Sequence, residues 1–202
     1  MITPIELITQ TSRRLVDQEE CFEYTTWSKV DLLDAFNFAL GVVAKYNKAY
    51  YSRPVEVHLR PGEVQELGDD CEELVGVLNL YAGQRLIGPV PLITVRPVSL
   101  LRRPWCADPY RPAGVELTGG RTFRVVPPVP EGMRNLRMIA VCFKAPRAEN
   151  LDEAIDVPVS HYPAVLELMM YYGHSFDIEA VPSRDRADAH WTRAMLLLGV
   201  AK

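Results

Sequence analysis

Residues 28–62 read SKVDLLDAFNFALGVVAKYNKAYYSRPVEVHLRPG, and the spacing of the apolar residues changes within this stretch. Ser28 is followed three residues later by Asp31, a combination typical of the start of a helix. The apolar residues that come next recur at helical spacing: Val30, Leu32, Leu33, Phe36, Leu40, Val43 and Tyr46. We therefore predict a helix from about Lys29 to Lys48.

The second part of the stretch has the period of a β-strand. Val55, Val57 and Leu59 alternate with polar residues, and Pro61-Gly62 then predicts a turn. Similar segments predict further strands at Leu74–Tyr81, Leu86–Val95, Val115–Leu117, Thr122–Val126 and Leu136–Phe143. Eleven of the 16 prolines lie between residues 54 and 130, which favours short strands and argues against a parallel sheet with crossover helices.

Helical patterns return on both sides of this β region. Thr3-Pro4 with Glu6 predicts a first helix, from about Pro4 to Val16. Two C-terminal helices are predicted at about His161–Glu179, which Gly173 need not interrupt, and from a Pro182-Ser183 cap to about Leu198, where Gly199 ends it.

Together these elements predict an α+β fold in a single domain, residues 1–202. We expect helices within 1–50 and 161–199 to form an antiparallel four-helix bundle with one shared core. A small antiparallel β module, residues 54–146, is expected as an insertion between helices two and three.

Composition excludes several classes of protein. The net charge of −4 argues against a protein that binds DNA electrostatically. Charged residues interrupt the first twenty positions, and no apolar run approaches the length of a membrane span, so we expect a soluble chain that stays in the cytosol where it is made. Cysteines at 21, 71, 106 and 142 are too widely spaced for a metal or redox pair, and we expect all four to be reduced.

No familiar catalytic motif is present in the sequence. His174 has Asp177 within one helical turn, and His190 has Asp188, but neither pair has further ligands nearby, so we expect surface charge pairs. The acidic run Asp69, Asp70, Glu72 and Glu73 is interpreted as a solvated turn. We predict no catalytic residue, no metal site and no cofactor.

Two segments are candidates for protein contacts. Arg102, Arg103, Trp105 and Tyr110 lie in a proline-rich connector that is either a solvated loop or an interface with arginine and tryptophan anchors. Near the C-terminus, Leu196, Leu197, Leu198 and Val200 form an apolar run that one helix face cannot fully bury. This run either closes the bundle or contacts a partner.

The order of several short motifs resembles the head-to-tail adaptor, or connector, family of short-tailed bacteriophages. The resemblance extends from about Trp27 to Gly199. It rests on these motifs: Trp27 before the helix that holds Leu32-Leu33 and Asn37, the strand end Arg60–Leu67, Leu101–Trp105, Val125–Pro128, Lys144–Pro146, Val157–Tyr162, and Tyr171-Tyr172 with Asp177.

The resemblance implies a structural virion protein, assembled in the host cytoplasm. It implies a ring of about a dozen copies, a dodecamer, that joins the portal protein to the tail nozzle or tail tube and lines the DNA exit channel. DNA would pass through without specific binding, and the C-termini would insert between portal subunits. The alternatives are a soluble binding or assembly module without a role in the virion, or an enzyme with an unrecognised site.

Overall fold

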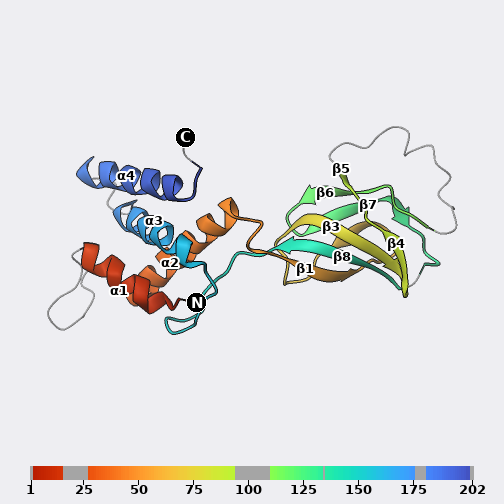
Figure 1. The fold of residues 1–202 in the computed structure, drawn as a ribbon, viewed down its shortest axis with the longest axis horizontal. Helices are drawn as coiled ribbons and strands as arrows, with labels where there is room; N and C mark the ends of the chain where they lie inside the picture. Colours follow the sequence, from red (N-terminus) through yellow and green to blue (C-terminus); the bar gives the residue numbers. More distant parts are fainter. Residues whose placement is uncertain (1, 16–26, 94–109, 134, 176–180, 201–202) are drawn as a thin grey trace. The chain divides into compact units, whose positions relative to one another are not determined.

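The computed structural model describes residues 2–15, 27–93, 110–133, 135–175 and 181–200, which form two compact units (Figure 1). One unit combines Met1–Tyr50 with Ala145–Lys202 and is helical. The other, Tyr51–Lys144, consists of β-strands. The chain therefore leaves the helical unit after Tyr50 and returns to it at Ala145.

The helical unit contains α1 (Pro4–Leu15), α2 (Lys29–Tyr46), the short 3-10 helix η2 (Val159–His161), α3 (Tyr162–Ser175) and α4 (Val181–Leu197). All four predicted helices are present, and α2 begins with the expected capping box. The Ser28 hydroxyl accepts a hydrogen bond from the Asp31 amide at 3.2 Å, and the Asp31 carboxylate accepts one from the Ser28 amide at 2.9 Å. The predicted Pro182-Ser183 cap is wrong, because α4 already includes Val181.

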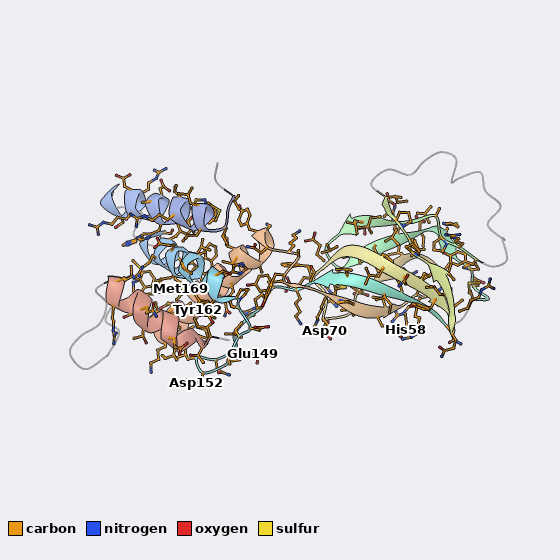
Figure 2. All side chains as sticks on the ribbon, viewed as in Figure 1. His58, Asp70, Glu149, Asp152, Tyr162 and Met169 are labelled. Carbon is orange, nitrogen blue, oxygen red and sulfur yellow. A yellow bond between two sulfur atoms is a disulfide. The ribbon has the colours of Figure 1, made fainter. Side chains whose placement is uncertain are left out.

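α3 is the central helix of this unit. Its residues are buried nearly all the way round, as expected of a helix surrounded by others. Met169 of α3, labelled in Figure 2, accepts a hydrogen bond at its sulfur from the Thr11 hydroxyl of α1 at 3.6 Å. Gly173 allows the Leu15 side chain to pack closely. α1 and α2 also pack on each other, whereas α4 packs mainly on α3. The helices therefore do not share one core equally.

The segment after Ala145 is tied to the helices by paired backbone and side-chain hydrogen bonds. The Asn37 side chain of α2 donates to the carbonyl of Ala148 at 3.0 Å and accepts from its amide at 2.8 Å. Ile2 and Ile155 exchange backbone hydrogen bonds of 2.9 and 2.8 Å. These contacts explain why a long non-helical segment belongs to the helical unit.

The β unit consists of two four-stranded sheets. The first has the order β1 (Ser52–His58), β8 (Leu136–Phe143), β3 (Glu73–Ala82) and β4 (Arg85–Gly88). The second has the order β2 (Gly62–Glu66), β7 (Thr122–Val129), β6 (Gly114–Gly119) and β5 (Leu92–Ile93). Alternate side chains of both sheets form one core, which includes Val57, Leu74, Leu80, Phe123, Val125, Met138 and Ala140.

The predicted four-helix bundle with a small β module is therefore wrong. The strands form two full sheets with their own core and account for about as much of the structure as the helices do. Sequence periodicity missed β2, because Pro61-Gly62 indicated only a turn, and it merged β4 with β5 across Gly88-Pro89. β5 also pairs with β6 in the parallel direction, so the β unit is not wholly antiparallel.

The expectation of four reduced cysteines is also wrong. A disulfide joins Cys71 to Cys142, and both residues are buried. The two positions are 71 residues apart in sequence, and they meet because β3 pairs with β8, placing Leu74 opposite Cys142. The spacing of the cysteines in the sequence alone cannot predict which of them pair in the fold. Cys21 and Cys106 lie outside the described residues.

Candidate interaction surfaces

The C-terminal end of α4 exposes large apolar side chains. Leu196 is 57% exposed, Leu197 is 52% exposed and Val200 is 43% exposed, while Leu198 is half-buried. The described residues of α4 that are buried are Ala187, Ala194 and Met195. Because these three face α3, the turns of the helix place Leu196 and Leu197 on the side away from it.

This end of the helix has a defined backbone geometry. Gly199 has a φ of +71°, a conformation that glycine adopts without strain. Its amide donates to the carbonyl of Leu196 at 3.0 Å, and the Val200 amide donates to Met195 at 2.9 Å. This is the Schellman pattern of helix termination, and it confirms the prediction that Gly199 ends the helix. These two hydrogen bonds give the helix end that carries the exposed leucines a defined backbone conformation.

An aromatic cluster connects α2, α3 and α4. The ring centroids of Phe38 and Tyr172 are 5.3 Å apart, those of Phe38 and Tyr171 are 6.1 Å apart, and those of Tyr171 and Trp191 are 5.0 Å apart. All four rings are half-buried. Trp191 therefore lies partly at the surface. Aromatic side chains with this partial exposure are enriched in protein interfaces.

Two carboxylates lie beside this cluster at the start of α2. Burial raises the pKa of the Tyr172 phenol, and the negative charges of Asp34 and Asp31 raise it further. We call this surface the acidic–aromatic face: Asp31, Asp34, Phe38, Tyr171 and Tyr172. Val30, which is 68% exposed, precedes it on α2.

A polar contact holds α4 against α3. The Nδ1 atom of His190 is 2.7 Å from a carboxylate oxygen of Glu167, and the rings of His190 and His174 stack with centroids 5.4 Å apart. The sequence suggested Asp188 as the neighbour of His190, but the recorded contact is with Glu167 on another helix. Asp177, the expected neighbour of His174, lies outside the described residues.

The acidic run before β3 forms ion pairs with other segments of the β unit. Asp69 pairs with Arg121 at 2.7 Å, and Asp70 lies 3.3 Å from Arg53 and 3.5 Å from Lys144. The expected solvated turn is therefore exposed, and ion pairs connect it to β1, to the turn between β6 and β7 and to the residue after β8. Within the described residues, no three potential ligand side chains gather to hold a metal ion.

Three apolar side chains of β3 and β4 are exposed. β3 contains two register shifts, at Leu74/Gly76 and Val77/Asn79, and each adds an exposed residue, Val75 or Leu78. Leu86 of β4 is also exposed. Strict alternation could not predict these positions, because each bulge changes which residues face outwards.

The family model described as SU10 adaptor protein matches residues 2–200, nearly the whole chain. The chain belongs to the SU10 adaptor protein family. No curated protein matches the chain. The resemblance to phage head-to-tail adaptors is thereby confirmed, and the chain is a structural phage adaptor protein that interacts with other virion proteins. Among the described residues of the adaptor, no helix is long and apolar enough to cross a membrane.

The proline-rich connector of the adaptor is described only at its end. Arg102, Arg103 and Trp105 lie outside the described residues. Tyr110 is buried in the β core, and its hydroxyl donates to the carbonyl of Pro127 at 2.7 Å. Burial raises the pKa of this phenol well above its usual value. The ring of Tyr110 is therefore covered by the adaptor's own residues.

Proposed function

We propose that the adaptor forms a ring, a dodecamer, between the portal protein and the tail nozzle or tail tube, and that its C-terminal leucines dock on the portal. The observation that carries this proposal is the exposure of Leu196 and Leu197 on a helix end with a fixed backbone. Family membership supplies the virion context. DNA would pass through the ring without specific binding, which suits the net charge of −4.

The chain itself leaves the apolar side chains of Leu196 and Leu197 more than half exposed. Burying Leu196 and Leu197 at a partner would contribute about 1.5–3 kcal/mol for each side chain before ordering costs. A single contact of this size is weak. Repeated around a ring, it becomes strong enough to determine docking, because the copies are held together and engage the partner jointly.

The test is co-assembly with the portal. Leu196→Ser with Leu197→Ser should abolish capture of the adaptor by portal rings while leaving its melting temperature nearly unchanged, since both side chains are exposed. Leu86→Ser with Leu78→Ser, on the β unit, is the matched control and should keep portal capture. Normal capture by the α4 variant, or loss of its fold, would overturn the assignment of these leucines.

The same proposal places Arg102, Arg103 and Trp105 at a neighbouring subunit or at the tail. Arginine and tryptophan are the residues most often found as energetic anchors of interfaces. Replacing all three by alanine should reduce the yield of tailed particles several-fold. Tailed particles at wild-type yield would mean that this connector is ordinary surface.

A further inference from the structure

A shallow groove runs along the helical unit between α1 and the N-terminal half of α3. Leu7, Gln10 and Arg14 line it from α1, and Pro163 and Leu166 line it from α3. It encloses about 410 Å³, which is room for a few side chains of a partner but not for a whole helix. Tyr162, at the start of α3 and labelled in Figure 2, also lines the groove.

Basic residues gather on this side of the helical unit. Glu167 is approached from α1 by Arg14 at 3.8 Å and from α4 by His190 at 2.7 Å. Arg186 and Arg193 lie four residues before His190 and three residues after it, so both share its side of α4. Both are exposed. We call Arg14, Arg186 and Arg193, together with the groove, the basic groove.

The carboxylates near the groove leave this surface positive. Glu167 is already engaged by Arg14 and His190. Glu6 also lines the groove, and its carboxylate accepts a long hydrogen bond from the Thr3 amide at 3.4 Å. Asp188 of α4 is two residues from His190 and therefore projects from a different side of the helix.

Tyr172 of the acidic–aromatic face lies on the opposite side of α3 from the groove. Pro163 in the groove and Tyr172 in the acidic–aromatic face are nine residues apart, which is two and a half turns of helix and places them about half a circle from each other. Phe38 of α2 packs on Tyr172, whereas Glu167 of the basic groove faces α4. Tyr172 and the groove therefore point in opposite directions, while Tyr171 lies beside α4, where its ring is 5.0 Å from that of Trp191.

We propose that these two surfaces form the contact between neighbouring copies of the adaptor, the acidic–aromatic face of one copy against the basic groove of the next. This inference rests on the proposed ring and names its contact. A contact between two different patches is heterologous, and such contacts close into rings. Arginines opposite carboxylates and aromatic faces gain both ion pairing and cation–π attraction. Exposed Val30 is of a size to enter the groove.

Sedimentation of the purified full chain over a range of concentrations tests the contact without a portal. We expect concentration-dependent self-association that weakens as salt is added, because exposed charges are screened. Arg193→Asp and Asp34→Arg should each weaken self-association by about tenfold or more, because each places like charges together. Arg85→Asp, with the same change in charge on β4, is the matched control and should associate like wild type.

The decisive variant combines the two reversals. Arg193→Asp with Asp34→Arg exchanges the signs of the two surfaces and should restore self-association to near the wild-type value. A wild-type chain that stays monomeric at millimolar concentration, single variants that associate normally, or a double variant that is not restored would each overturn the proposal. The variant Leu196→Ser with Leu197→Ser separates this result from the proposed function, because neither leucine belongs to the two surfaces: it should self-associate like wild type while portal rings no longer capture it.

Discussion

The Nδ1 atom of His190 lies 2.7 Å from a carboxylate oxygen of Glu167, and this contact holds the last helix of the adaptor on the central one. Both side chains are only 15% exposed. Among the described residues, α4 buries Ala187, Ala194 and Met195, and this contact adds a polar attachment near its middle. The position of Leu196 and Leu197 depends on that attachment.

Removing this contact should loosen α4. We expect His190→Ala to lower the free energy of unfolding by about 1–3 kcal/mol, because a half-buried carboxylate loses a hydrogen-bond partner. Denaturant titration measures the loss, with exposed Arg193→Ala as the control that changes little. A His190→Ala protein as stable as the control would show that apolar packing alone holds the helix.

The disulfide between Cys71 and Cys142 predicts a redox-dependent stability. Reduction should lower the melting temperature of the wild-type chain, and the loss in free energy should be about 2–4 kcal/mol. Thermal melts with and without a thiol reductant measure it. The double variant Cys71→Ala with Cys142→Ala should melt at the same temperature in both buffers. Equal melting temperatures for reduced and oxidised wild type would contradict the prediction.

Two helical glycines should respond in opposite ways to substitution. A Cβ atom at Gly173 would lie 2.9 Å from Leu15, whereas one at Gly41 would meet no atom within 4 Å. We expect Gly173→Val to destabilise the chain by about 1–3 kcal/mol through overpacking. Gly41→Ala should stabilise it by about 0.5–1 kcal/mol through helix propensity. Chemical denaturation of both variants tests the difference in sign.

Tyr110 should make stability fall at alkaline pH. Burial raises its pKa in the folded state above the usual value of 10.0, so the unfolded chain releases the phenol proton first. Stability from this group is complete below pH 10 and is lost as the pH rises above it. Tyr110→Phe should lack this alkaline component and should lose about 1 kcal/mol at neutral pH with the Pro127 hydrogen bond. Identical stability–pH curves for the two proteins would contradict the assignment.

The helices could be predicted from the sequence because their signals are local. The capping box at Ser28 and Asp31 and the terminating Gly199 were both confirmed by hydrogen bonds. The two-sheet architecture could not be predicted from the sequence, because it depends on pairing between distant segments, such as β2 with β7, and on the bulges of β3. Short strands interrupted by proline and glycine also carry too few residues for a clear period.

Of the candidate surfaces, likewise, one could be predicted from the sequence and another could not. The apolar run at Leu196–Val200 was visible as a sequence pattern, and three of its four candidate residues are exposed. The basic groove could not be predicted, because it combines Arg14 of α1 with Arg186 and Arg193 of α4, and Glu167 contacts Arg14 and His190 only after the helices pack. Tyr110 looked like an interface residue among prolines and arginines, but the fold of β6 and β7 covers it.

The measurement that most directly tests the proposed function is electron microscopy of purified particles that carry a small protein tag on the N-terminus of this chain. The tag should appear as extra density repeated around a ring between the portal and the tail, and particles without the chain should lack that ring. Tag density elsewhere in the particle, or a complete ring in particles made without the chain, would contradict the proposed role as the portal-to-tail adaptor.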